Sequence, residues 1–292
     1  MLKKACWTAS MLIFIIACHR SGPPTSGDDF IQDPQYDADA QEAIGVIYSM
    51  QLPTDIIEIF EKTGTGFSPD FTIPLKRISL YDYPGQMALL IGALGVDLSY
   101  CKLFERKVES SEYYRNIELL ANNLDLPREI FEKTSDELQW YVNNPDSLTG
   151  LIDQIFTEVD SYFRDQNQES LAYLTLLGGW LEAMYISVRI YQDKSILEMG
   201  ERILQQKYAL NSLYGLLANY QESLVIRKYM HPLNQLKEIF REVEIKYSKE
   251  GFKLDQQNKM FRANSVEITY EQETLDEICG MILNIREQII NY

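Results

Sequence analysis

Apolar residues recur at three- and four-residue spacing almost without a break from residue 84 to residue 292, and alternating strand-like runs are scarce. This spacing puts apolar side chains on one face of a helix. The sequence therefore predicts an all-α fold of about ten helices. The candidate helices span 38–50, 53–62, 85–106, 110–123, 127–143, 147–164, 168–192, 194–207, 210–229, 232–249 and 265–290.

The predicted helices pair into hairpins that start near Gly85, Pro127, Gln168 and Leu210, about 42 residues apart. This period is typical of α-hairpin repeats stacked into a solenoid. No tetratricopeptide consensus fits it, and helices of ordinary length also produce such spacing. Two architectures of stacked helical hairpins stay open, an α-solenoid of TPR-like form and an irregular helical bundle.

The chain is strongly acidic, with 43 Asp and Glu against 27 Lys and Arg and a net charge of −16. Nucleic-acid affinity comes mainly from basic side chains that neutralise phosphates, so nucleic acid is an unsuitable partner. Two histidines in 292 residues argue against a multi-histidine metal centre. No phosphate-binding loop, nucleophile elbow or zinc-protease motif is present. The sequence thus predicts no metal and no cofactor, and it favours a protein without enzymatic activity.

The N-terminus has the layout of an export signal. Lys3 and Lys4 precede an apolar run over 5–17, and a polar stretch begins after Cys18. A mostly apolar run of thirteen residues is too short to cross a bilayer as a helix, which takes about 20. It matches the apolar segment of a signal peptide that ends in a small residue.

Ile15-Ile16-Ala17-Cys18 resembles the lipobox of a bacterial lipoprotein. The resemblance implies cleavage before Cys18, lipidation of its thiol with palmitate-type chains, and a membrane as partner. His19, in place of the Asp that retains enterobacterial lipoproteins at the inner membrane, favours the outer membrane of the cell envelope. The layout is a signal peptide over 1–17, a flexible tether over 18–36 and one helical domain over 37–292, and it resembles all-helical lipoproteins of Bacteroidota-type bacteria.

Two cysteines, Cys101 and Cys279, lie within the predicted helical domain, whereas Cys6 belongs to the signal. An extracytoplasmic location would permit a disulfide between them. Both lie in apolar helical contexts, where a free cysteine behaves as a small hydrophobic residue. The sequence leaves both alternatives open.

Two predicted helices resemble each other. Residues 89–100 and 174–185 each contain glycines in an apolar run, followed by an acid and, three residues later, a tyrosine. A glycine inside a helix costs about 1 kcal/mol relative to alanine, so it usually has a packing reason. We expect these glycines to allow close helix–helix approach across the core.

The acid–tyrosine pairs are Asp97 with Tyr100 and Glu182 with Tyr185. Residues three apart share a helix face, so the two pairs are expected to project into one interior space. A carboxylate on an apolar helix must find a partner or shift its pKa, and many functional sites have this origin. One alternative is a structural lock, and the other is a ligand-binding pocket.

Two long connections complete the prediction. The segment 63–84 contains three prolines and four aromatic residues, so it either covers a binding site or is pinned on the core by its aromatics. The segment 248–264 is expected to be an exposed loop. His231 and Pro232 are expected to start a helix.

The leading functional hypothesis is a lipid-anchored envelope protein whose helical body is an interaction scaffold. One alternative is a small-molecule-binding lipoprotein with an interior pocket floored by Asp97, Tyr100, Glu182 and Tyr185. A hydrolase that uses two of these carboxylates is a third. The partner, whether a protein or a small molecule, is not identified by the sequence.

Overall fold

The computed structural model describes residues 30–31, 66–130, 157–248, 253–255, 260–262 and 266–290. The expected signal peptide, Cys18, most of the tether and the predicted helices 38–50 and 53–62 lie outside these residues. The main helices are α3 (Pro84–Leu103), α4 (Lys107–Asn123), α7 (Glu169–Lys194), α8 (Leu197–Gln205), α9 (Lys207–Ala218), α10 (Leu224–Phe240) and α11 (Gln272–Ile290). The prediction of a mainly helical protein is confirmed.

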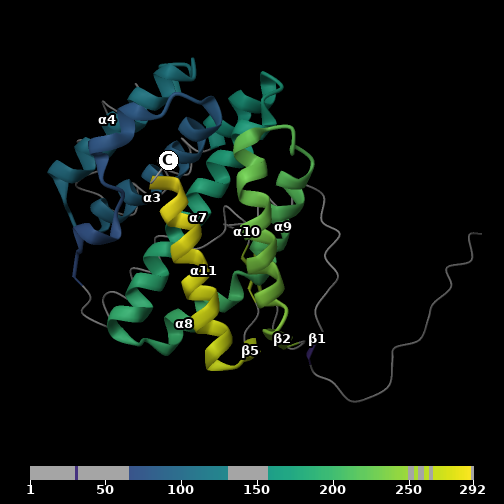
Figure 1. Cartoon of the computed structure of the whole chain (residues 1–292). Helices are drawn as coiled ribbons and strands as arrows, with labels where there is room; N and C mark the ends of the chain where they lie inside the picture. The colour runs from purple at the N-terminus through teal and green to yellow at the C-terminus, as the bar shows by residue number, and fades with distance from the viewer. Residues whose placement is uncertain are drawn as a thin grey trace, which may run out of the picture.

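Helices α3 and α7 form the centre of the fold. Helix α4 packs against α3 on one side, α9 and α10 lie on the other, and α11 runs across α7 (Figure 1). Helices α3 and α7 are apolar on nearly every face and are buried along most of their length. A helix with so little polar surface has to lie inside the protein core or in a membrane.

By length and composition, α3 and α7 would both be able to cross a membrane. Within the fold, 83% of the most apolar 18-residue stretch of each helix is buried inside the protein. The central helix of a globular core has the same composition. The apolar character of α3 and α7 is therefore accounted for by their place in the core.

The close approach of α3 and α7 depends on glycine. A Cβ atom on Gly92 would lie 1.8 Å from the carbonyl oxygen of Thr175, and one on Gly178 would lie 1.8 Å from that of Leu89. Each helix thus places a glycine against a backbone carbonyl of the other helix. In both cases this carbonyl belongs to the residue three positions before that helix's own glycine. The expectation that these glycines allow close packing is confirmed.

The two helices run in the same direction. Near the start of α3, Gly85 meets Leu174, and further along Gly92 meets Thr175 and Gly179. Beyond the glycines, the carboxyl of Asp97 meets that of Glu182. Parallel packing in this register carries the two acids to the same place.

A small β-structure follows α10 and was not predicted. Strand β2 (Glu244–Ser248) pairs antiparallel with β1 (Phe30–Ile31) and with β5 (Val266–Thr269), and β3 (Lys253–Asp255) pairs with β4 (Met260–Arg262). The predicted helix 232–249 is therefore wrong beyond residue 240, and the predicted loop 248–264 contains strands. The predicted helix 265–290 likewise begins as β5.

Helices α9 and α10 differ in their boundary from the prediction. Helix α10 begins after Ser223, whose hydroxyl accepts a hydrogen bond from the amide of Ile226. Serine is a favoured N-cap residue because its oxygen satisfies a free amide of the first turn. Pro232 lies inside α10, and His231 is not at a helix start. The prediction that they begin a helix is wrong.

Gly92→Ala and Gly178→Ala test the backbone contact. Each methyl group would overlap a carbonyl that belongs to a rigid helix, so we expect losses of about 3 kcal/mol or more in the free energy of unfolding. Gly280→Ala is the control, because Gly280 lies in α11 with open space at its Cβ position. There, alanine should be neutral or stabilise by up to about 1 kcal/mol. Urea unfolding measures both, and similar values for the three variants would contradict the close approach.

Candidate functional site

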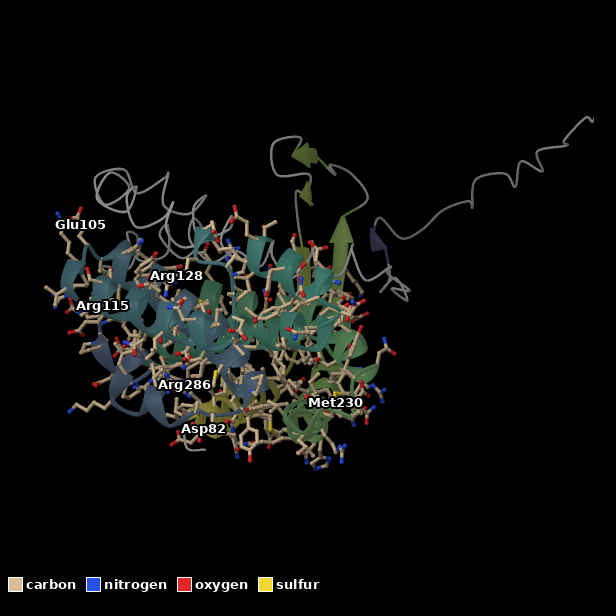
Figure 2. The ribbon with its side chains drawn as sticks, turned by 90° about the horizontal axis from the view of Figure 1, so that it is seen from above. Asp82, Glu105, Arg115, Arg128, Met230 and Arg286 are labelled. Carbon is tan, nitrogen blue, oxygen red and sulfur yellow. The ribbon has the colours of Figure 1, made fainter. Side chains whose placement is uncertain are left out.

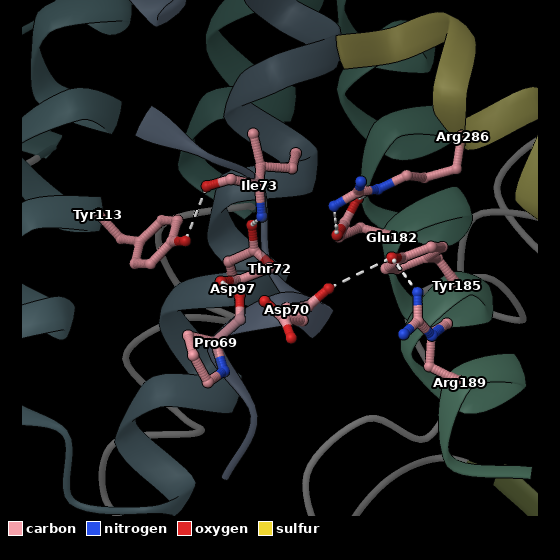
Figure 3. A network of polar contacts seen from close by, with 10 residues as sticks. All are labelled: Pro69, Asp70, Thr72, Ile73, Asp97, Tyr113, Glu182, Tyr185, Arg189 and Arg286. Atoms are coloured by element: carbon pink, nitrogen blue, oxygen red, sulfur yellow. Dashed lines mark hydrogen bonds and ion pairs between the residues drawn. The ribbon is translucent and has the colours of Figure 1, made fainter. Parts of the chain in front are cut away.

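Asp97 on α3 and Glu182 on α7 lie together in the protein core. Neither side chain is accessible to solvent. Both carboxyls interact with each other and with Arg286 on α11, so that three helices converge on one polar cluster (Figure 3). Of the four residues that the sequence singles out, the two acids therefore occupy the same interior position.

Glu182 forms a two-pronged ion pair with Arg286. Nε of Arg286 donates to Oε2 of Glu182 at 3.0 Å, and Nη2 donates to Oε1 at 2.8 Å. Arg286 is only 4% exposed, whereas Glu105 and Arg115 project from the periphery of the fold (Figure 2). A paired arrangement of this kind satisfies both carboxylate oxygens and fixes α11 against α7.

Asp97 contacts the segment that leads into α3. The backbone amide of Ile73 donates to Oδ2 of Asp97 at 2.9 Å, and Ile73 itself is buried. Oδ1 of Asp97 is buried and has no hydrogen-bond partner among the described residues. Asp97 thus holds a non-helical segment by one oxygen and leaves the other unsatisfied.

The two tyrosines hydrogen-bond to the same segment. The hydroxyl of Tyr100 accepts from the amide of Ser68 at 3.0 Å, and that of Tyr185 donates to the carbonyl of Asp70 at 3.4 Å. Nη1 of Arg189 donates to the Tyr185 hydroxyl at 3.1 Å. In each acid–tyrosine pair, the two residues therefore share a helix face but contact different partners.

Residues 66–83, which we call the strap, lie over α3 and α7. The strap contains two short 3-10 helices, η1 (Pro69–Phe71) and η2 (Leu75–Leu80). Phe71 is buried, and Tyr100 packs against it with a centroid separation of 6.3 Å and against Phe67 with one of 5.4 Å. Of the two alternatives for the strap, its described residues confirm pinning on the core by aromatics.

Two further tyrosines, one on α4 and one within the strap, join the strap to other helices. The hydroxyl of Tyr113 on α4 donates to the carbonyl of Ile73 at 2.8 Å. The hydroxyl of Tyr81, within the strap, donates to the carbonyl of Ile289 near the end of α11 at 2.9 Å. The strap is therefore joined to α3, α4, α7 and α11.

Arginines lie on the aromatic faces beside the cluster. The guanidinium of Arg286 lies 4.0 Å from the ring centroid of Tyr185, and that of Arg189 lies 5.3 Å from the ring of Phe71. A cation over an aromatic face is attracted by the ring's electron density. These contacts orient Arg286 toward Glu182 and join α7 to the strap.

Burial shifts the pKa values of the cluster. It raises the pKa of Asp97 well above its ordinary value, and the negative charge of Glu182 raises it further. Burial also raises the pKa of Glu182, but the guanidinium of Arg286 opposes the rise. Burial acts to lower the pKa of Arg286, and Glu182 more than offsets that effect. Because Arg286 pairs directly with Glu182, its positive charge favours the ionised form of Glu182.

The other candidate residues do not join the cluster's polar contacts. Cys101 and Cys279 are free and buried, which is the second of the two alternatives for them, and burial raises the pKa of each thiol to about 12. Within the described part of the chain, no group of three or more His, Cys, Asp or Glu side chains is arranged to hold a metal ion.

Arg286 and Tyr113 complete the cluster and were not predicted. Arg286 stands 104 positions from Glu182 in the sequence, so no local spacing connects them. A cation in an amphipathic helix usually faces water. The one available signal was the apolar stretch around Arg286, with Ile285 before it and Ile289 three residues after it, which places it on the buried face of α11.

Comparisons with protein-family models, with curated proteins and with solved structures gave no significant match. The site is therefore interpreted from its own geometry. The hydrogen bonds between the strap and Asp97, Tyr100 and Tyr185, and the ion pair of Glu182 with Arg286, each join one element of the fold to another. Such contacts are those of a structural lock.

Arg286→Met tests this interpretation. Removal of the guanidinium leaves Glu182 buried without its partner, so the free energy of unfolding should fall by about 3–5 kcal/mol. The control is Arg241→Met, because Arg241 pairs with Glu238 at the surface, where both side chains are largely exposed. That change should cost less than about 1 kcal/mol. Chemical denaturation of both variants measures the difference, and equal losses would contradict the lock.

Proposed function

We propose that this protein is a lipid-anchored component of the cell envelope whose helical body binds a partner through its outer surface. The observation that carries the proposal is the closed state of the interior cluster. Asp97 and Glu182 are fully buried, and Tyr100 and Tyr185 are engaged with the strap. Because the interior polar groups serve the fold, the outer surface is the part of the body available for recognition.

The anchor is proposed from the lipobox-like residues 15–18. Twelve residues further on, Phe30 begins β1, which pairs with β2 of the body. An extended chain reaches at most about 3.5 Å per residue, so a lipid on Cys18 would keep this sheet within about 40 Å of the bilayer. The acidic body, with a chain charge of −16, would then stand close to the outer membrane.

Attachment by lipid also agrees with the composition of the core. Helices α3 and α7 are the described helices with enough length and apolarity to span a bilayer, but the fold already buries most of their surface. Each buried methylene of an acyl chain contributes about 0.8 kcal/mol, so several chains on one cysteine hold a protein at a membrane stably. We therefore assign membrane attachment to Cys18.

For the architecture, we favour an irregular bundle of about ten helices over a solenoid. In a solenoid, each repeat contacts only its neighbours. Helices α3 and α7 begin two predicted hairpin periods apart, yet they share the glycine contact at the centre of the fold. A partner would then meet the convex exterior of a bundle.

Cys18→Ser tests the anchor. We expect the variant to lose the acyl modification and to leave the membrane fraction, measured by mass spectrometry of the N-terminal peptide and by fractionation. Cys6→Ser is the matched control, because Cys6 lies in the segment expected to be removed and should leave acylation intact. Loss of membrane association in both variants, or in neither, would refute lipidation at Cys18.

Cross-linking in intact cells tests the binding surface. We expect a defined partner set that is the same for the unchanged protein and for Asp97→Asn, because Asp97 is inaccessible from outside. A binder with an interior acid–tyrosine pocket would instead lose its ligand when Asp97 changes. Loss of the cross-linked partners with an unchanged melting temperature would favour that alternative.

A further inference from the structure

The buried cluster contains more acid than base. Two carboxyls, those of Asp97 and Glu182, meet one guanidinium, that of Arg286. If both acids were ionised, the core would hold one uncompensated negative charge. Such a charge is very costly in a low-dielectric interior, and a group in this position usually becomes neutral.

Among the described residues, Arg286 is the one cation that acts on Asp97. The titratable neighbours that act on it or feel its charge are Tyr100 and Cys101 on its own helix and Tyr113 on α4, besides Glu182 and Arg286. The strap contributes the amide of Ile73. Burial raises the pKa of Tyr100 and of Cys101 to about 12, so both are neutral under physiological conditions.

The hydrogen bonds of the cluster point to the same imbalance. Both oxygens of Glu182 accept from Arg286, and Oδ2 of Asp97 accepts from Ile73. Oδ1 of Asp97 is buried and has no hydrogen-bond partner among the described residues. The carboxyl of Asp97 interacts with that of Glu182. Two oxygens without a hydrogen between them repel each other, whereas a proton on one of them makes a hydrogen bond.

We propose that the Asp97–Glu182 pair holds one bound proton at neutral pH, located on Oδ1 of Asp97 and shared with Glu182, and that this proton keeps the strap closed. The cluster is then neutral as a whole. It forms a continuous chain from the Ile73 amide through Asp97 and Glu182 to Arg286. The proton thus takes part in joining the strap, α3, α7 and α11.

Opening of the strap is therefore coupled to release of the proton. When residues 66–83 leave α3, water reaches Asp97, and its carboxyl titrates near its ordinary value of 3.8. In the closed form its pKa is well above that value. Between the two values the closed form binds one proton more than the open form, so a rise in pH favours opening. The device holds the strap tightly in acid and loosens it toward alkaline pH.

Amide hydrogen exchange of the strap between pH 5 and pH 8 measures the coupling. After division by the intrinsic rate at each pH, the exchange rate of the Ile73 amide should rise with pH in this window, by up to about tenfold per pH unit. Asp97→Asn is the matched variant, since its amide group keeps an acceptor for Ile73 and offers Glu182 a donor without a titratable proton. Its corrected rate should stay flat.

Infrared difference spectra report on the proton directly. The unchanged protein should show the C=O stretch of a protonated carboxyl at neutral pH, and Asp97→Asn should lack it. Glu182→Gln should also lack it, because Asp97 would then be the single carboxyl beside Arg286 and would ionise. This second variant separates sharing within the pair from neutralisation by burial alone.

Three results would overturn the proposal. The first is a flat corrected rate for Ile73 in the unchanged protein, and the second is the same slope in Asp97→Asn. The third is a protonated-carboxyl band that survives in either variant. If all slowly exchanging amides of α7 showed the slope of Ile73, opening would be global and the assignment to the strap would be wrong.

Discussion

The backbone contact between α3 and α7 determines the rest of the structure. Gly92 and Gly178 each face a carbonyl of the other helix at a distance that admits no side chain. Each glycine weakens its own helix by about 1 kcal/mol relative to alanine, and the loss is offset by packing that only this close approach permits. The contact also sets the register. It is this register that brings Asp97 and Glu182 together one turn beyond the glycines, where apolar packing alone would place no acid.

The polar cluster selects one arrangement of the elements around a core that is otherwise apolar. Leucine and isoleucine side chains tolerate many arrangements of helices, because their attraction has little directionality. The pair between Glu182 and Arg286 requires one rotation of α11, and the bonds from Asp97 and Tyr113 to Ile73 require one path for the strap. A buried ion pair contributes little net stability, so its effect here is on the uniqueness of the arrangement. The strap has no helical pattern of apolar residues that would fix its position on the core. These hydrogen bonds fix its position instead.

The helical class, the glycine contact and the meeting of the two acids could be predicted from sequence, because each has a local signature of spacing along one or two helices. The partners that the two acids contact could not be predicted in this way. Arg286 meets Glu182 across 104 residues, and only the packing of α11 selects it. The strands were missed for a different reason. Residues 244–248 alternate between polar and apolar, with Ile245 buried, but five residues after a long helix also continue a helical pattern. Pairing with β5 decides between the two.

A buried acid with a raised pKa is often part of a functional site, but such shifts also arise in structural networks. The geometry distinguishes the two cases here. A catalytic or binding carboxyl needs one side open to its ligand, whereas Asp97 is enclosed by the amide of Ile73, the carboxyl of Glu182 and the buried faces of α3 and α7. Its second oxygen is buried and has no hydrogen-bond partner among the described residues. The raised pKa then follows from two carboxyls that share one guanidinium, and recognition falls to the exterior of the helical body.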